Sequence, residues 1–328
     1  MPTRVLHLLP TLQGADAARR VALLCEQLPR DQFEQHVAAF RAAGAAAPRL
    51  RSLAAGVHDL RRRFRRDPIA ALALRRLARS LNVDVVHAWG AEAATHAAWC
   101  GRRVVRTTSD DEPLAGWLTS NTLPFTPPVA WTAATQPLQP TGEAMARPPE
   151  LPAHARLIGA AAPLVPASRL KELIWAIDLI RVVQPDVWLV IVGDGPQRAS
   201  LEEFSRLACE ENRTLLLGDR GDLPDLLPHF DLWWQSGQPA DPPLTLLEAL
   251  AAELPVVADR CDSAAAVVEE GVTGALIKPA DRAERAKSTL KLLEADSRRH
   301  ADDSCPVGAL PSSDELIAAC AAAYAAER

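Results

Sequence analysis

The segment GQPADPPLTLLEALAAELPVVAD, from Gly237 to Asp259, combines a helix start with a carboxylate inside the helix. The helix begins among prolines, at Pro243–Thr245, and carries Glu248. Free N–H groups at a helix start hold about half a positive charge and attract anions. A carboxylate there can accept hydrogen bonds from the hydroxyl groups of a ligand, or it can favour the helix dipole from the first turn. The segment therefore indicates either a binding site or an ordinary helix.

Signatures of several other chemistries are missing from the sequence. There is no Walker motif, no GxSxG and no zinc signature, and VGDGPQ (192–197) lacks the three-glycine spacing of dehydrogenase-type nucleotide sites. We interpret Gly193 and Gly195 as residues that permit a tight turn after a strand. The cysteines show neither CxxC nor zinc-ligand spacing, which predicts a reduced compartment; they are Cys25, Cys100, Cys209, Cys261, Cys305 and Cys320.

Length and composition indicate a globular chain. Its 328 residues correspond to two domains of roughly 100–200 residues each. The net charge of -5 argues against bulk binding of nucleic acid, which requires a basic surface. The start, MPTRVLHLLPTLQG, does not read as a secretory signal, and the uncharged run 113–142 is too rich in proline for a membrane span. We therefore expect a cytoplasmic protein.

The first half alternates between short apolar strands and amphipathic helices. Asp67 can cap the helix expected at 67–81, and Pro68 suits its first position. Alternation at this spacing predicts right-handed strand–helix–strand units and a parallel sheet. The strands are expected at 4–10, 33–40, 83–89 and 102–108, and the other helices at 16–28 and 91–101.

This pattern stops at Asp110 and returns at Ala155. Between them only 128–134 resembles a strand, so we expect an irregular end of the first domain and a linker. We also expect one of Trp233 and Trp234 in the core. Further strands are expected at 155–164, 187–193, 214–219, 231–236 and 255–259, a helix at 168–183, and a terminal helix at 312–328 with Ser312 or Ser313 as its cap.

Several segments carry a family pattern in order and spacing: IGAAAPLVPASRLKELIWAI, VIVGDGPQRASLEEF, LLLGDRGDLPDLLPHFDLWWQS, PPLTLLEALAAELPVVAD and EEGVTGALIKPAD. Together they resemble the donor domain of family-4 retaining glycosyltransferases with the GT-B fold. The first half resembles the acceptor domain through RVLHLLPTL, LPRDQFEQHVAAF and VDVVHAWG. The resemblance implies an α/β protein with two Rossmann-like doubly wound domains, 1–150 and 151–311, that face a cleft. It also implies that the helix at 312–328 crosses back to the first domain.

The resemblance further implies transfer of a hexosyl group from a nucleotide-diphosphate sugar to an acceptor, without a metal ion or another cofactor. Relatives place an Arg and a Lys near the diphosphate, where this chain has Pro163 and Ser168. They also carry two carboxylates eight residues apart, for sugar hydroxyls and for the ribose. Ala240 stands at the first of these positions, Glu248 matches the second, and Asp241 replaces a common glycine between them.

Residues beside these positions are candidates for donor binding. Arg169 and Lys171 could partly replace the missing cations, or they could be solvated residues of the helix surface. Leu244 and Thr245 offer backbone N–H groups at the helix start, and Gly193 follows a neighbouring strand.

The first half departs from the family pattern as well. Where relatives have a glycine-rich turn and an acidic residue, this chain reads QGADAARR, with Ala15, Asp16 and Ala18, and Gly14 is out of place. His87 is a candidate acceptor-side residue, and the alternative is a packed or capping histidine. The losses in both halves favour a second hypothesis, a catalytically inactive descendant that acts as a binding or scaffold partner of an active paralogue.

The basic run LRRRFRRD (60–67) has two interpretations. Arg61–Arg66 could contact an anionic membrane at its inner face, with Phe64 inserted between the lipids. The alternative is a solvated loop that precedes a helix.

Overall fold

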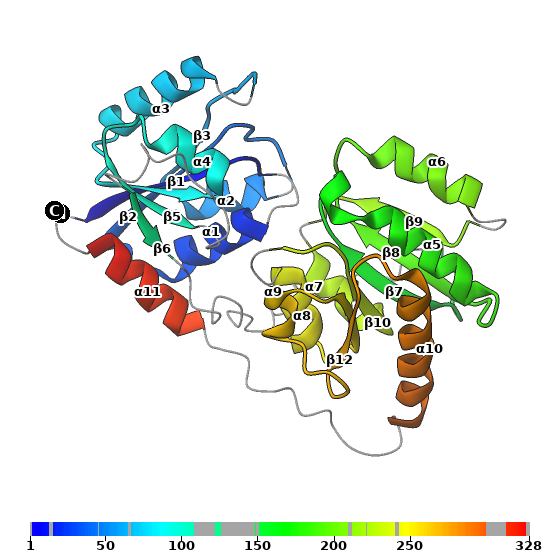
Figure 1. Ribbon diagram of the computed structural model, residues 1–328. Helices are drawn as coiled ribbons and strands as arrows, with labels where there is room; N and C mark the ends of the chain where they lie inside the picture. The colour runs from blue at the N-terminus through cyan, green and yellow to red at the C-terminus, as the bar shows by residue number, and fades with distance from the viewer. Residues whose placement is uncertain are drawn as a thin grey trace. The chain divides into compact units, whose positions relative to one another are not determined.

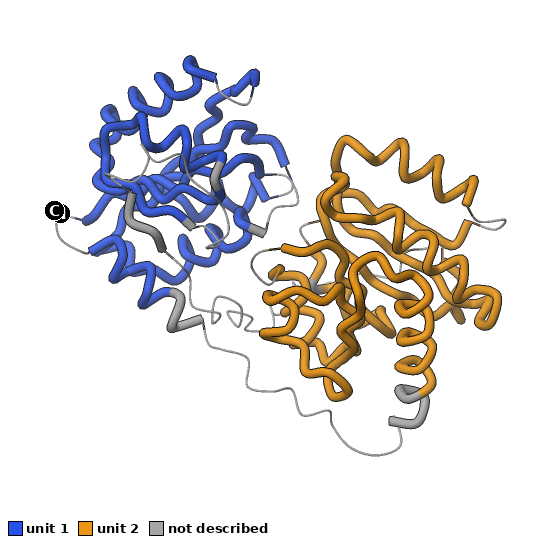
Figure 2. Tube along the Cα trace, in the orientation of Figure 1, with its two compact units in different colours: residues 1–134, 312–328 blue, residues 135–311 orange. Residues whose placement is uncertain are grey.

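The computed structural model divides the chain into two compact units (Figure 2). Unit 1 comprises residues 1–134 and 312–328, and unit 2 comprises residues 135–311. The structure describes residues 2–12, 16–44, 46–64, 67–107, 122–125, 148, 151–208, 212–220, 222–239, 243–299 and 313–325. Among these residues, no helix is long and apolar enough to cross a lipid bilayer.

Unit 1 is built on a six-stranded parallel sheet with the order β3-β2-β1-β4-β5-β6 (Figure 1). The strands are β1 (Thr3–Leu9), β2 (Phe33–Ala39), β3 (Gly56–Asp59), β4 (Val85–Trp89), β5 (Arg103–Thr107) and β6 (Thr122–Phe125). The helices are α1 (Asp16–Gln27), α2 (Ala47–Leu53), α3 (Pro68–Ser80), α4 (Ala91–Ala97) and α11 (Ser313–Ala325).

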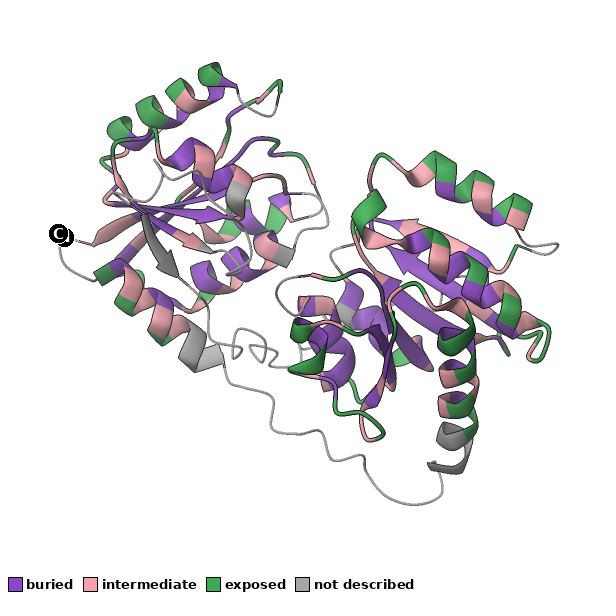
Figure 3. Ribbon diagram, in the orientation of Figure 1, coloured by how far each residue is buried: buried purple, intermediate pink, exposed green. Residues whose placement is uncertain are grey.

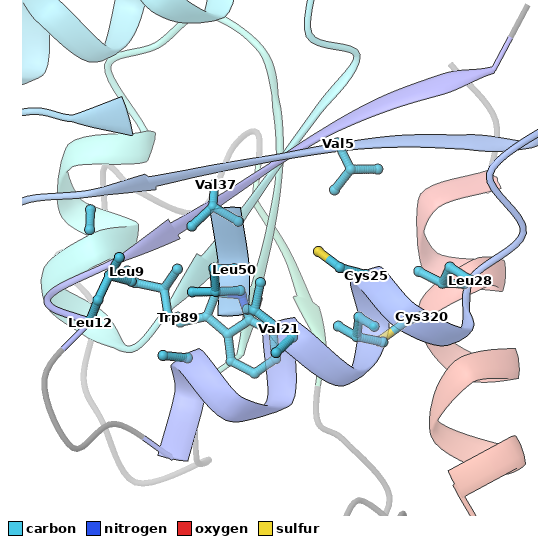
Figure 4. Packing of buried hydrophobic residues seen from close by; sticks show 14 of the residues in the cluster. Val5, Leu9, Leu12, Val21, Cys25, Leu28, Val37, Leu50, Trp89 and Cys320 are labelled. Atoms are coloured by element: carbon cyan, nitrogen blue, oxygen red, sulfur yellow. The ribbon is translucent and has the colours of Figure 1, made fainter. Parts of the chain in front are cut away.

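Helices cover both faces of this sheet, so the unit is doubly wound. On one face, α1, α2 and α11 pack on the core shown in Figure 4, which includes Val5, Leu24 and Cys320. On the other face, α3 and α4 pack on Leu6, Leu8 and their neighbours. The terminal helix therefore belongs to the first unit, as the family resemblance predicts.

Unit 2 repeats this architecture with a second six-stranded parallel sheet, in the order β12-β11-β10-β7-β8-β9. The strands are β7 (Arg156–Ala161), β8 (Val187–Val192), β9 (Thr214–Gly218), β10 (Leu232–Gln235), β11 (Val256–Asp259) and β12 (Gly274–Ile277). The α-helices are α5 (Leu170–Arg181), α6 (Arg198–Ala208), α7 (Leu223–Leu226), α8 (Leu244–Ala251), α9 (Asp262–Ala265) and α10 (Arg282–Arg299), with short 3-10 turns at Pro166–Ser168 and Leu227–His229.

The two cores of unit 2 lie on opposite faces of its sheet. The first contains residues of α5, α6 and α10, and the second contains residues of α7, α8 and α9. Figure 3 shows most strand residues of this sheet buried, with the middle of the edge strand β9 at intermediate burial, while α5, α6 and α10 expose one side. Trp234 packs in the first core and Trp233 in the second, because successive strand residues point to opposite faces. The expectation that one of them is buried is therefore too cautious, since both are.

Several elements were not predicted from the sequence. They are the short elements α2, β3, β6 and α9 and the long helix α10. The strands β3 and β6 form the two edges of the sheet in unit 1 and have only four residues each, so their hydrophobic pattern is weak. The strand β6 contains Pro124, which is tolerated at a sheet edge, and it lies in the segment expected to be irregular. The predicted strand at 128–134 lies outside the described residues.

Candidate functional site

The carboxyl ends of the parallel strands in unit 2 lie at one edge of the sheet, where doubly wound proteins bind ligands. The loops that follow β7, β8 and β10 contain most of the predicted donor-binding positions. These loops contact one another: the backbone N–H of Leu164 donates to the carbonyl of Asp194 at 3.1 Å, and Ser236 Oγ donates to the carbonyl of Ser168 at 2.6 Å. The fold therefore gathers positions that are distant in the sequence.

Gly193 and Gly195 allow the loop after β8 to approach the loop after β7. A Cβ on Gly193 would lie 2.1 Å from the carbonyl oxygen of Ala162, and one on Gly195 would lie 2.7 Å from that of Leu164. Gly193 also has a φ of 140°, a conformation that favours glycine. Close backbone packing explains both glycines, and a donor contact of Gly193 stays a prediction.

The positions expected to hold cations form a neutral turn before α5. Ser168 Oγ donates to the carbonyl oxygen of Pro163 at 2.6 Å. Arg169 follows in the left-handed conformation, with a φ of 50°, at the N-cap position of α5. The Nζ of Lys171 lies 5.2 Å from the ring centre of Phe204 on α6. This contact favours the surface interpretation of Lys171, whereas Arg169 stands at the helix start.

Glu248 is buried, with 4% of its surface exposed, and lies in the second turn of α8. The interpretation of Glu248 as a first-turn residue is wrong, because the helix begins at Leu244, directly after Pro243. The hydroxyl oxygen of Thr245 is buried in the first turn, and it has no hydrogen-bond partner within the described part of the chain. Ala240 and Asp241 lie outside the described residues.

A buried ion pair, not predicted from the sequence, connects α10 to the ends of β10 and β11. Arg285 donates to the carboxylate of Asp259 at 2.5 Å, and their side chains are 3% and 2% exposed. The guanidinium also donates to the carbonyl oxygens of Val257 and Gln235, at 3.1 and 3.4 Å. The other oxygen of Asp259 accepts from the backbone N–H of Gly237 at 2.8 Å. Burial lowers the pKa of Arg285 from its ordinary value, and the charge of Asp259 opposes this shift.

This ion pair helps to fix the loop that leads from β10 towards α8. Gly237 has a φ of 81°, and a Cβ on it would lie 3.0 Å from the carbonyl oxygen of Ala167. Ser263 Oγ donates to the carbonyl of Pro239 at 2.6 Å, next to the predicted sugar-contact position. The loop is thus held by groups from β11, α9 and the turn before α5.

In unit 1 the predicted acceptor-side residue His87 is fully buried. Its Nδ1 lies 2.6 Å from the hydroxyl of Tyr324 on α11, and its ring stacks on Trp89. Beside it, His7 Nε2 lies 3.1 Å from Gln35 Oε1. Burial lowers the pKa of His7 to about 4 and places that of His87 well below its ordinary value. This placement favours the packed interpretation of His87, while Gly14 lies outside the described residues.

The basic run before α3 is partly used by the fold. Arg62 forms an ion pair with Glu92 at 2.6 Å and lies over the ring of Phe40. Asp67 caps α3, as expected, by accepting from the N–H groups of Ile69 and Ala70. Phe64 is 56% exposed, whereas Arg65 and Arg66 lie outside the described residues.

Two family models match the chain. Residues 155–295 match "Glycosyl transferases group 1", and residues 17–136 match "Glycosyltransferase Family 4". A curated relative, N-acetyl-alpha-D-glucosaminyl L-malate synthase of Bacillus anthracis, is 29% identical over 126 residues. That match covers 38% of this chain and only 33% of the relative.

Solved structures share the fold over nearly the whole chain. HepE of Anabaena, solved in complex with UDP and glucose, is 18% identical, with a TM-score of 0.65, and the match covers 98% of this chain and 95% of that one. WaaG, a glycosyltransferase involved in lipopolysaccharide biosynthesis, is 13% identical, with a TM-score of 0.66 and coverage of 98% and 100%. Sucrose-phosphate synthase of Thermosynechococcus elongatus is 12% identical, with a TM-score of 0.70 and coverage of 98% and 98%.

These matches confirm the family and the fold expected from the sequence. The group 1 model covers the sheet of unit 2 with the loops of the candidate site, and the family 4 model covers most of unit 1. The chain is a glycosyltransferase-like protein: it belongs to the group 1, family 4 glycosyltransferases and has two Rossmann-like domains of the GT-B type.

Proposed function

We propose that unit 2 binds a nucleotide-diphosphate sugar at the carboxyl edge of its sheet, and that transfer of the hexosyl group has been lost or strongly slowed. The observation that carries the proposal is the neutral turn at Pro163 and Ser168, in which the Ser168 hydroxyl donates a hydrogen bond to the Pro163 carbonyl oxygen. The family resemblance places an Arg and a Lys at these positions. What would remain for the diphosphate is Arg169 and the N–H groups at the start of α8.

The cost of the lost cations can be bounded. A nucleotide diphosphate leaves with negative charge, which cationic side chains stabilise in the transition state. Each charge-assisted hydrogen bond contributes about 1.5–3 kcal/mol, so two of them contribute about 3–6 kcal/mol. At about 1.36 kcal/mol per tenfold change, their loss slows transfer by about 10²–10⁴. Binding can survive such a change, and a binding or scaffold role beside an active paralogue then becomes the function.

An active transferase is the second candidate. Glu248 is retained at the position where relatives hold the ribose, and unit 2 keeps the arrangement of strands and loops. HepE, which matches this chain over 95% of its own length, has also been solved with UDP-glucose. These observations favour retained recognition of a nucleotide sugar and set no limit on the rate of transfer.

The test is calorimetric titration of the full chain with UDP-, GDP- and ADP-sugars. We expect one nucleotide class to bind, with no need for a metal ion, so that EDTA leaves the affinity unchanged. Glu248→Gln should weaken binding by about 10–100-fold, because it removes a charged acceptor. Glu253→Gln is the matched control, since Glu253 is exposed and lies just after the same helix.

A restoration variant separates the two candidates. Pro163→Arg, Ser168→Lys and Ala240→Glu together should raise donor affinity and, in a descendant with an intact scaffold, donor turnover. Failure of all nucleotide sugars to bind at millimolar concentration would refute the proposal. Rapid transfer by the unmodified chain would instead establish the active transferase.

We further propose that unit 1 touches an anionic membrane through Arg61–Arg66. Support comes from Phe64, which is exposed in the middle of the basic run. Arg61 and Arg63 are exposed as well. The full chain should co-sediment with vesicles that contain phosphatidylserine and not with neutral vesicles. Arg63→Glu with Phe64→Ser should abolish this binding, whereas Leu72→Ser on α3, another exposed apolar site, should leave it intact. Equal binding to neutral vesicles would contradict the proposal.

A further inference from the structure

Two histidines lie side by side at one edge of the sheet in unit 1. His36 is on β2 and His58 is on β3, the edge strand of four residues. In the parallel register His36 pairs with Gly56, and Ala38 pairs with His58. Because side chains alternate along a strand, both histidines project from the same face of the sheet. Their ring centres are 6.0 Å apart, so the two imidazoles are neighbours across the strands.

One nitrogen of each ring approaches the same point beside Gly56. A Cβ on Gly56 would lie 3.3 Å from His36 Nδ1 and 3.0 Å from His58 Nε2. Both nitrogens are buried, and neither has a hydrogen-bond partner among the residues that the structure describes. A buried polar atom without a partner has lost its hydrogen bond to water, at a cost in free energy. Two such nitrogens near one point therefore indicate a shared ligand.

The carboxylate of Glu34 fixes the tautomer of His36. His36 Nε2 lies 3.1 Å from Glu34 Oε1, and the other oxygen of Glu34 accepts from Arg4 at 3.0 Å. Hydrogen bonds from Arg4 and His36 lower the pKa of Glu34, so its carboxylate is ionised at neutral pH and can only accept. His36 Nε2 must then carry a proton, and a neutral His36 keeps its lone pair on Nδ1. A carboxylate behind the ring is the usual second partner of a histidine that binds a metal ion.

His58 is suited to the same role. Burial and the neighbouring His36 lower the pKa of His58, so its imidazole is neutral at neutral pH and has a lone pair to offer. The residue is partly exposed, which gives an ion a path from the solvent. Neutral imidazole suits zinc, copper and nickel ions, whereas magnesium and calcium prefer oxygen ligands. Within the described ranges no three His, Cys, Asp or Glu side chains form a metal site, so an ion held here has two protein ligands and otherwise water.

We propose that His36 Nδ1 and His58 Nε2 bind a divalent transition-metal ion, with zinc as the type case, which connects the edge strand β3 to β2. Zinc–imidazole bonds are about 2.0–2.1 Å long, and the partly exposed His58 ring can turn to meet this distance. Glu34 acts through His36 and is a positioning residue. The proposal concerns unit 1 alone and does not depend on nucleotide binding.

The first test is calorimetric titration of the full chain with zinc chloride to about 1 mM, after treatment with EDTA and removal of the chelator. We expect saturable binding at neutral pH, and His58→Gln should weaken it by at least about tenfold, because it removes a ligand. His154→Gln is the matched control, since His154 is a largely exposed histidine of unit 2 beside Asp186. Absence of zinc binding would overturn the proposal, as would binding that His58→Gln leaves unchanged.

The second test identifies the two nitrogens. In long-range proton–nitrogen correlation spectra of the full chain, zinc should shift the resonances of His36 Nδ1 and His58 Nε2 and leave His36 Nε2 protonated. Gly56→Ala keeps both ligands but puts a methyl group at the point that they approach, so it should weaken zinc binding by about tenfold or more. Zinc shifts confined to other histidines would overturn the proposal, as would a Gly56→Ala variant that binds zinc as the native chain does.

Thermal unfolding separates loss of the site from loss of the fold. An ion that binds only the folded chain raises its unfolding temperature. Zinc should therefore raise the unfolding temperature of the native chain and of His154→Gln, but not that of His58→Gln or Gly56→Ala, although each variant unfolds cooperatively without zinc. An equal rise in all four proteins would place the ion elsewhere and overturn the proposal.

Discussion

Replacing Arg285 with Met is expected to lower the free energy of unfolding of unit 2 by about 3–5 kcal/mol. The substitution keeps most of the side-chain volume but leaves the Asp259 carboxylate buried without its cation. It also removes the donor to the carbonyl oxygens of Val257 and Gln235. The change is measured by urea unfolding of the full chain, with pulsed amide exchange followed in peptides from β10 and β11.

Two variants show whether the loss comes from an unpaired charge. Asp259→Leu combined with Arg285→Met removes both charges and should recover much of the stability, as replacement of buried ion pairs by apolar residues often does. Arg282→Met is the matched control on the same helix, where the ion pair with Glu172 is partly exposed. It should cost only about 1–2 kcal/mol, including the contact with Trp175. An equal loss in Arg282→Met would contradict the expected role of burial.

The ion pair also affects the candidate site, because Asp259 accepts from Gly237 in the loop after β10. With Arg285→Met in place, Asp259→Asn keeps an acceptor for this N–H, whereas Asp259→Leu does not. The Gly237 amide should therefore exchange faster in the Leu variant than in the Asn variant. If nucleotide binding is also weaker in the Leu variant than in the Asn variant, the loop after β10 takes part in the proposed site. If the Gly237 amide exchanges equally fast in both variants, the hydrogen bond to Asp259 has no role in holding this loop.

Local patterns in the sequence are sufficient for most of the fold. The strand β8 is a continuous apolar run, and α3 carries its cap and its first-turn proline, so both are predictable from neighbouring residues. The short edge strands β3 and β6 lack such a pattern. Their place in the sheet depends on pairing with β2 and β5, and a segment of four residues carries too little pattern to predict that pairing.

The candidate site is predictable to a smaller extent. Positions such as Ser168 and Gly193 follow strand ends, so a parallel sheet brings them to one edge. The ion pair is different, because Arg285 stands in RAERAK among charges that are typical of an exposed helix surface. Only packing shows that Arg285 and Thr289 lie on the buried side of α10. Likewise, the partner of His87 is Tyr324, which is 237 residues away, so the sequence alone favours a packed histidine over a site histidine without identifying its partner.

Acidification from pH 6.5 to about 4 is expected to destabilise unit 1 by about 3 kcal/mol through His7 alone. Burial lowers the pKa of His7 from 6.5 to about 4 in the folded chain, whereas the unfolded chain keeps the ordinary value. Below pH 6.5, His7 therefore binds a proton in the unfolded state but stays neutral in the folded state, so the free energy of unfolding falls as the pH falls. A difference of about 2.5 pKa units corresponds to about 3 kcal/mol, at about 1.36 kcal/mol per unit. His87 acts in the same direction, because burial and the charge of His7 lower its pKa as well.

The window between pH 6.5 and 4.5 distinguishes these histidines from acidic groups. The pKa of Glu34 is lowered from 4.5 by hydrogen bonds from Arg4 and His36, so its contribution to stability is lost only at lower pH. Substitution of both His7 and His87 by Gln should flatten the loss of stability in this window, in urea titrations read by amide exchange in peptides from β1 and β4. His58→Gln is the control, because His58 is less buried, although burial also lowers its pKa. If stability still falls between pH 6.5 and 4.5 in the double variant, the acid sensitivity belongs to other groups. If stability no longer falls, the two buried histidines cause it, and the contact of His87 with Tyr324 makes the packing of α11 depend on pH.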